Sequence, residues 1–152
     1  MKFLILGNAS SIIYKEVFPL IKDNKIWWGI SPRGMNFETP EGGTINVNAC
    51  WFTNLPHPKR TEKLTLYKKY NPEEYPHYDN YDAIEVSKTK NIPVDWDGQM
   101  GVPVTFLDKY NPEQFEILGR CRDMELTSEP RGNVSVNGKV LYMRLIIKRK
   151  QL

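Results

Sequence analysis

A short run of apolar residues near the N-terminus limits the possible folds more than any other feature of the sequence. The run FLIL occupies residues 3–6 and stops at Gly7-Asn8. An apolar run without polar alternation is typical of a strand covered on both faces in an α/β sheet. It is too short for the apolar region of a secretory signal, and no small-residue cleavage site follows it. We therefore expect a buried β-strand.

A helix is expected to follow this strand. Ser10 or Ser11 is suited to cap its start, and Asp23-Asn24 is suited to end it. Apolar residues recur between these points with helical spacing, at Ile13, Val17, Leu20 and Ile21. Pro19 removes one helical N–H donor, so we expect a kink or restart near Val17.

Two further strands are expected in this part of the chain. Residues 26–30 form one, and the alternating residues 44–52 form another that returns antiparallel to it. The alternation places Trp51 and Phe52 on opposite faces. Between the two strands, proline and glycine residues predict an unusually long loop over residues 32–43.

Beyond Leu55 the sequence becomes rich in proline and tyrosine, which places a subdomain boundary at residues 56–58. The string KYNPE occurs at residues 69–73 and again at 109–113. In each copy Asn suits a helix cap, Pro suits the first helical position and Glu lies near the positive helix end, so both copies predict short helices, the second ending at Gly119.

The last part of the sequence predicts a β-hairpin. Asn137-Gly138 is a strong signal for a type I′ turn, with strands expected over residues 133–136 and 139–147. The final strand carries basic residues at its end, namely Arg144, Lys148, Arg149 and Lys150.

Charge is segregated along the chain, although the net charge of +3 and pI near 8.8 are only mildly basic. Residues 56–70 carry five basic residues against one acidic, and residues 71–87 carry five acidic residues and no basic one. Such segregation is typical of a surface that faces a polyanion. The alternative is that the two blocks are solvated loops that pair with each other.

Common enzyme motifs are absent from the sequence. It contains no GxGxxG, GxxxxGK[ST], GxSxG or HExxH string, and neither the two cysteines nor the two histidines have metal-ligand spacing. Asp95 and Asp97 flank Trp96 before Gly98, where turn chemistry explains them better than catalysis does. We assign no catalytic, cofactor-binding or metal-binding residue, and expect a reduced, cytoplasmic chain with no membrane span.

Longer strings carry a family resemblance. YKEVFPLIK at residues 14–22, followed by NKIW at 24–27, then WFTNL at 51–55 and DGQMGVPVTFLDKYNPEQFEILG at 97–119 resemble the EcoRI modification methylase family of adenine-specific DNA methyltransferases. The resemblance extends over nearly the whole chain. It implies adenine-N6 methylation of DNA, with S-adenosylmethionine as the methyl donor, on a Rossmann-like sheet.

The motifs that such chemistry requires are missing from these residues. The family's glycine-rich donor turn and its Asn-Pro-Pro-Phe type motif have no counterpart, because neither KYNPE copy has the second proline or the aromatic residue. The strand order of residues 2–52 instead matches the last three strands of the family's sheet, which end in an antiparallel hairpin. The resemblance thus makes residues 1–55 the C-terminal part of the core sheet and residues 56–152 the target-recognition region.

Three functions remain open from the sequence. The first is a methyltransferase part that contacts double-stranded DNA, whose catalysis requires an absent N-terminal portion. The second is a non-enzymatic nucleic-acid-binding module, favoured by Tyr67 and Tyr70 among the basic residues of 56–70. The third is a protein-assembly piece, because an unpaired edge on the first strand would favour a partner chain or a homo-oligomer.

Candidate contact residues follow from the leading interpretation. Phe52, rather than Trp51, is expected to stack on an extruded adenine, with the alternative that both rings belong to the core. Base edges are expected to be read by polar side chains such as Asn46, Asn48 or Gln99. The expected contacts to DNA phosphates are Arg33, Lys59, Arg60, Lys63, Lys68 and Lys69.

Overall fold

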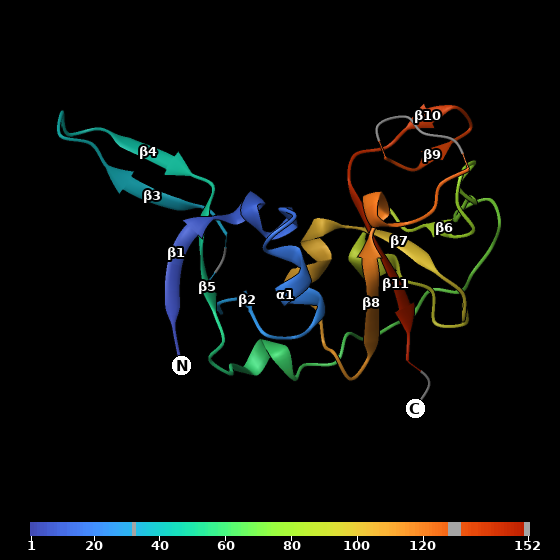
Figure 1. Ribbon diagram of the computed structural model, residues 1–152, viewed down its shortest axis with the longest axis horizontal. Helices are drawn as coiled ribbons and strands as arrows, with labels where there is room; N and C mark the ends of the chain where they lie inside the picture. Colours follow the sequence, from blue (N-terminus) through green and yellow to red (C-terminus); the bar gives the residue numbers. More distant parts are fainter. Residues whose placement is uncertain (32, 128–131, 151–152) are drawn as a thin grey trace. The chain divides into compact units, whose positions relative to one another are not determined.

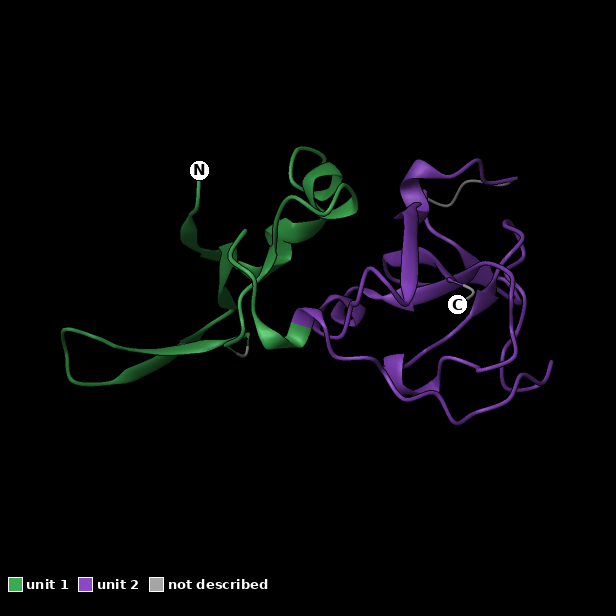
Figure 2. Ribbon diagram, turned by 90° about the horizontal axis from the view of Figure 1, so that it is seen from below, with its two compact units in different colours: residues 1–59 green, residues 60–152 purple. Residues whose placement is uncertain are grey.

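The computed structural model of the chain describes residues 1–31, 33–127 and 132–150. These residues form two compact units, Met1–Lys59 and Arg60–Leu152 (Figure 2). Each unit has its own sheet and buried side chains, and each is described separately. The roles that we attach to the two parts of the chain, core sheet and target recognition, remain predictions.

Unit 1 is built on a three-stranded sheet in the order β1-β5-β2 (Figure 1). The strands are β1 (Leu4–Asn8), β2 (Trp27–Trp28) and β5 (Ala49–Thr53), and the central β5 is antiparallel to both neighbours. Trp28 pairs with Phe52, so the expected antiparallel return to residues 26–30 is confirmed for β5.

Strand β1 differs from the expected buried strand. The exposed fractions of Leu4, Ile5 and Leu6 are 54%, 54% and 44%. Within the described residues β1 pairs with β5 alone and forms the edge of the sheet. The apolar run does predict the strand, but the described residues leave the side chains of Leu4, Ile5 and Leu6 largely exposed.

The segment after β1 forms two short helices instead of one. A 3₁₀ helix, η1 (Ala9–Ile13), is capped by Asn8, whose side chain accepts the N–H of Ser10, so the expected serine cap is wrong. The helix α1 (Phe18–Lys22) begins after Val17 with Pro19 in its first turn and ends at Asp23. The restart at Val17 is confirmed, because proline is compatible with a helix only near its N-terminus.

The expected long loop over residues 32–43 is wrong, because most of it belongs to a β-hairpin. Strands β3 (Met35–Glu38) and β4 (Thr44–Val47) pair antiparallel and project from the rest of unit 1 (Figure 1). The turn is closed by Thr39, whose N–H donates to the carbonyl of Gly43 at 2.8 Å. The expected single strand over residues 44–52 is therefore two strands in different sheets, which separate at Asn48.

Unit 2 contains a four-stranded sheet in the order β6-β7-β11-β8. Only the β6/β7 pair is parallel among these strands of the described chain. Side chains with almost no exposure pack on the sheet, including Phe106, Phe115, Leu145 and Ile146. The strands are β6 (Ile84–Glu85), β7 (Met100–Pro103), β8 (Phe115–Arg120) and β11 (Arg144–Arg149).

The remaining elements are short 3₁₀ helices and the strands of a hairpin. They are η2 (Pro58–Arg60), which spans the boundary between the units, η3 (Thr89–Asn91), η4 (Val104–Asp108), η5 (Cys121–Asp123), β9 (Ser135–Val136) and β10 (Lys139–Val140).

The two KYNPE strings form single turns, so the expected short helices are wrong. The Asn71 side chain accepts the N–H of Glu74 at 2.8 Å, and that of Asn111 accepts the N–H of Glu113 at 2.9 Å. The capping chemistry is therefore present in both copies. After Asn111 the chain enters β8, in which residues 115, 117 and 119 are buried against the rest of unit 2. Gly119 lies inside this strand, and pairing with β11 overrides the local helix signal.

The expected hairpin turn is confirmed. Asn137 and Gly138 have φ values of 50° and 79°, the left-handed conformation that a type I′ turn needs, and they connect β9 to β10. The Asp79 carboxylate accepts the N–H groups of both turn residues, at 3.0 and 2.8 Å. The expected strand over residues 139–147 is divided into β10 and β11.

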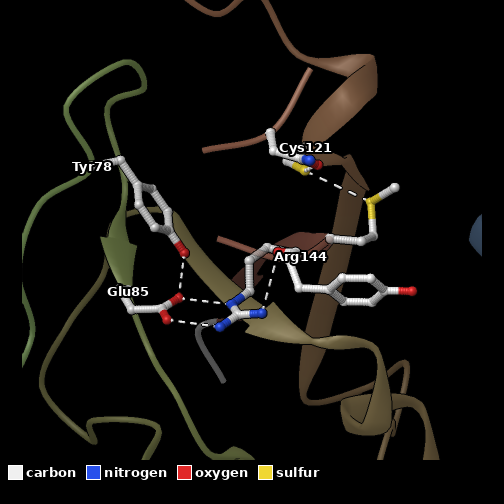
Figure 3. Close-up of polar contacts among 7 residues, drawn as sticks. Tyr78, Glu85, Cys121 and Arg144 are labelled. Atoms are coloured by element: carbon white, nitrogen blue, oxygen red, sulfur yellow. Dashed lines mark hydrogen bonds and ion pairs between the residues drawn. The ribbon is translucent and has the colours of Figure 1, made fainter. Parts of the chain in front are cut away.

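A buried polar cluster crosses the sheet of unit 2 (Figure 3). Arg144 on β11 donates to both carboxylate oxygens of Glu85 on β6, and the Tyr78 hydroxyl donates to the same carboxylate. Burial, together with the Glu85 charge, raises the pKa of the Tyr78 phenol far above its ordinary value. A Cβ atom at Gly101 would lie 1.8 Å from the Tyr78 oxygen, so glycine is needed there for close approach.

Candidate nucleic-acid interface

The candidate interface is centred on the basic segment, which we define as residues 59–70. From residue 61 onward this segment has no helix or strand, yet exposed and half-buried residues alternate from 63 to 70. Such alternation indicates an extended chain with one face on the protein and the other toward solvent. The segment is thus a strand-like edge without a partner strand in the described chain.

Hydrogen bonds from the rest of unit 2 hold the basic segment in place. The Gln114 side chain accepts the N–H of Leu64 at 2.8 Å and donates to its carbonyl at 2.7 Å, as a partner strand would. Asp95 accepts the N–H of Tyr70 at 2.7 Å, and the N–H of Val94 donates to the carbonyl of Lys68 at 2.8 Å. The backbone is therefore anchored at several points along its length.

The side chain of Lys68 is engaged within the protein. Its ammonium group forms an ion pair and hydrogen bond with Glu74. This hydrogen bond raises the pKa of Lys68 and lowers the pKa of Glu74. The pair joins the basic and acidic blocks, as the alternative interpretation of the charge pattern expects, so Lys68 is a weaker candidate for a phosphate contact.

The other basic candidates have different surroundings. Lys63 and Lys69 are exposed, whereas Lys59 and Arg60 are half-buried. The Arg60 guanidinium lies 5.7 Å from the ring centroid of Tyr110, and burial lowers the pKa of Arg60. Arg33 belongs to unit 1, where its guanidinium lies 5.1 Å from the ring centroid of Trp28.

An aromatic cluster beside the basic segment was not predicted from the sequence. The rings of Tyr70 and Trp96 lie 4.4 Å apart, with Tyr75 6.0 Å from Tyr70 and His77 5.9 Å from Trp96. The tyrosine-rich composition after Leu55 was its only signal. The last residue of the basic segment, Tyr70, thus packs against the rings of Trp96 and Tyr75.

The side chains named as base readers all form hydrogen bonds within the protein. Asn46 donates to Asn36 at 2.9 Å across the β3–β4 hairpin, and Asn48 donates to Ser10 at 3.0 Å. The Gln99 side chain accepts the hydroxyl of Tyr81. Each of these groups would have to exchange a bond within the chain for one to a base.

The two candidate stacking residues lie in the central strand of unit 1. Phe52 has an exposed fraction of 5%, and a Cβ atom added at Gly7 would lie 3.4 Å from its ring. Trp51 is half-buried beside Gly29. In this chain Phe52 therefore packs as a core residue, and stacking on a base remains a prediction for an assembled enzyme.

Comparison with known proteins identifies the family. The family described as "Adenine-specific methyltransferase EcoRI" matches residues 1–150. The chain belongs to the EcoRI family of adenine-specific methyltransferases.

Curated relatives of this EcoRI-family chain are type II methyltransferases. M.EcoRI of Escherichia coli is 47% identical, with 99% of this chain and 51% of the relative covered. M.MgeORF184P of Mycoplasma genitalium is 37% identical and M.MpnI of Mycoplasma pneumoniae is 34% identical, with 58% and 57% of those relatives covered. The chain thus spans between 51% and 58% of the length of these relatives. No solved structure matches it.

The methyl donor used in the EcoRI family would need a glycine-rich turn, which neither Gly7 nor Gly42-Gly43 provides. A donor turn in a Rossmann-like sheet needs glycines that let the backbone approach the ligand. Gly7, at the end of β1, instead lies against the ring of Phe52. Gly42 and Gly43 lie in the turn between β3 and β4, which leads into a strand and not a helix.

A metal site and a membrane-spanning helix would each place structural requirements on the described part of this EcoRI-family chain. No group of three or more His, Cys, Asp or Glu residues there is placed to hold a metal ion. Cys50 and Cys121 are buried free thiols. No described helix has the length and apolarity needed to cross a bilayer.

Proposed function

We propose that this chain is the C-terminal, DNA-contacting portion of a DNA adenine-N6 methyltransferase, and that methyl transfer requires N-terminal cofactor and catalytic motifs from polypeptide outside these residues. The observation that carries the proposal is strand β1. Its outer edge is unpaired within the described chain, and its apolar side chains are exposed. Further strands of the same sheet would pair with this edge and bury those side chains.

The topology of unit 1 supports the same proposal. The antiparallel strand β5 lies between β1 and β2, as expected for the last three strands of a methyltransferase sheet. Most of the exposed large apolar side chains of the described residues also lie in unit 1, which indicates that this unit needs a partner surface. They are Met1, Leu4, Ile5, Leu6, Tyr14, Leu20, Ile30, Phe37, Ile45 and Val47.

The proposed partner of unit 2 is double-stranded DNA. The basic segment presents positive charge on an anchored backbone, and contacts of this kind supply most of the affinity for a duplex. Arg33 of unit 1 and the basic residues 59–70 are the proposed contacts. S-adenosylmethionine is the proposed donor of the assembled enzyme, bound by the N-terminal portion.

Reconstitution tests the proposal. The chain is mixed with the portion of M.EcoRI that it does not match, and transfer of radiolabelled methyl groups to adenine in duplex DNA is measured. We expect transfer by the mixture and none by either part alone. Turnover by the isolated chain, or micromolar binding of S-adenosylmethionine to it by calorimetry, would show that the chemistry lies within these residues.

A non-enzymatic nucleic-acid-binding module is the second candidate function. It is favoured by Tyr67, whose exposed fraction is 64%, and which precedes Tyr70 of the Tyr70–Trp96 ring pair by three residues in the sequence. Exposed aromatic rings among basic residues stack on unpaired bases. Strong binding to single-stranded nucleic acid, together with no methylation in the reconstituted mixture, would favour this function over the first.

A further inference from the structure

The outward face of the basic segment consists of hydrogen-bond donors. Lys63, Thr65, Tyr67 and Lys69 are all exposed and stand at every second residue. Two of these side chains end in an ammonium group and two in a hydroxyl group. Within the described part of the chain, none of the four forms a side-chain hydrogen bond or ion pair. We call these four residues the donor ridge.

Among the described residues, the backbone bonds that anchor residues 62–70 use the residues between those of the ridge. The carbonyl of Glu62 accepts the Asn111 amide at 3.2 Å, and Leu64, Lys68 and Tyr70 are held by Gln114, Val94 and Asp95. Residues 62, 64, 68 and 70 thus bind the protein, and residues 63, 65, 67 and 69 face solvent. A ridge anchored in this way is ordered before any ligand binds, which lowers the entropy cost of binding.

We propose that the donor ridge binds the phosphate backbone of one strand of duplex DNA. This inference rests on the proposed function and deepens it, because it selects Lys63 and Lys69, adds Thr65 and Tyr67, and excludes Lys68. Lysine, threonine and tyrosine side chains are typical phosphate donors in protein–DNA complexes. At about 3.3 Å per residue the ridge is about 20 Å long, which corresponds to several phosphates of one strand.

Local charge would include Lys68 among the phosphate contacts, whereas the geometry of the donor ridge excludes it. Lys68 lies between Tyr67 and Lys69 in sequence, but its ammonium group forms an ion pair with Glu74. If local charge alone mattered, all three lysines would contribute equally to the salt dependence of binding. The ridge geometry predicts unequal contributions.

The test measures the affinity of the full chain for a fluorescent duplex by anisotropy at several salt concentrations. The log-log salt slope is about −0.9 for each phosphate contact, so Lys63→Ala with Lys69→Ala should flatten it by about 2. Arg122→Ala with Lys139→Ala is the matched control, since both residues are exposed and the change in charge is the same. Strand β10, which carries Lys139, lies at the other end of unit 2 from residues 61–70 (Figure 1).

Single substitutions test the remaining ridge residues. Tyr67→Phe and Thr65→Val remove only a hydroxyl, and each should raise the Kd by about 2- to 10-fold with little change in the salt slope. Lys68→Ala should change the slope by less than Lys63→Ala or Lys69→Ala does. Far-UV circular dichroism and the urea midpoint check that each variant remains folded.

The outcomes separate this inference from the proposed function. Salt-dependent duplex binding that Lys63→Ala/Lys69→Ala leaves unchanged would overturn the ridge and keep DNA as the partner. A wild-type chain without salt-dependent duplex binding would overturn both. Preference for single strands, with Tyr67→Ala harmful and Tyr67→Phe silent, would assign Tyr67 to base stacking and overturn the duplex-phosphate ridge.

Discussion

Arg144 and Glu85 are 59 residues apart in the sequence and form a bidentate ion pair, with N–O distances of 2.9 and 3.0 Å. The two residues lie on β11 and β6, which are separated in the sheet by β7. Their side chains have exposed fractions of 15% and 11%. The pair therefore connects two strands that share no backbone hydrogen bonds with each other.

Breaking this pair should destabilise the chain strongly. Glu85→Ala leaves a mostly buried guanidinium without its partner, and loss of one member of a buried pair costs about 3–5 kcal/mol. Urea unfolding followed by circular dichroism measures the change. Asp97→Ala is the control: it removes the pair with Arg149, in which the Asp97 side chain has an exposed fraction of 66%, and should cost less than about 1 kcal/mol. Equal effects of the two substitutions would contradict the role of the Arg144–Glu85 pair.

The β9–β10 turn should depend on pH through Asp79. Hydrogen bonds from the backbone N–H groups of Gly138 and Asn137, and from the Ser135 hydroxyl, lower the pKa of Asp79 below its ordinary value. The resulting stability is present above the pKa of the unfolded state and is lost as pH falls through the lower, folded-state pKa. The protection factors of the Asn137 and Gly138 amides, which correct the measured exchange rates for the intrinsic effect of pH, should fall as the solution is acidified through and below the ordinary pKa of an aspartate, about 3.9. Asp79→Asn should remove most of this pH dependence, and an equally steep response in that variant would refute the assignment.

Phe52→Leu tests whether the Phe52 ring stacks on an extruded adenine in the assembled enzyme. Leucine keeps most of the apolar volume next to Gly7 but removes the aromatic face. Stacking of a base on an aromatic ring is worth about 1–3 kcal/mol, so methylation should slow by about 5- to 150-fold and 2-aminopurine fluorescence at the target position should change. Phe18→Leu is the control, since Phe18 is another buried ring of unit 1. If Phe52→Leu behaves like Phe18→Leu in both measurements, Phe52 is a core residue alone.

The exposed edge strand should make the isolated chain self-associate. Sedimentation velocity should show a sedimentation coefficient that rises with concentration, because β1 offers unpaired backbone groups and apolar side chains. Ile5→Lys places a charge on this strand and should suppress the association. Ile45→Lys on β4 is a matched control, since Ile45 and Ile5 have exposed fractions of 52% and 54%. Suppression by Ile45→Lys alone would move the contact to the β3–β4 hairpin.

The sequence by itself determined the features that depend on local backbone preferences. The helix restarts after Val17 and Asn137-Gly138 forms the predicted turn. Both follow from the φ values that Pro19, Asn137 and Gly138 themselves prefer. The long strings shared with the EcoRI family were also sufficient to identify the family. The position of the basic segment followed from charge alone.

Only the tertiary structure decided where contacts between residues distant in the sequence override these local preferences. Asn111 starts a turn and not a helix, because β8 pairs with a strand about 30 residues later. Charge along the chain did not reveal that Lys68 faces Glu74 while Lys63 and Lys69 face solvent, because that division depends on anchors from Gln114, Val94 and Asp95. An apolar run predicts a strand, but whether the strand is buried depends on which other strands and helices cover it.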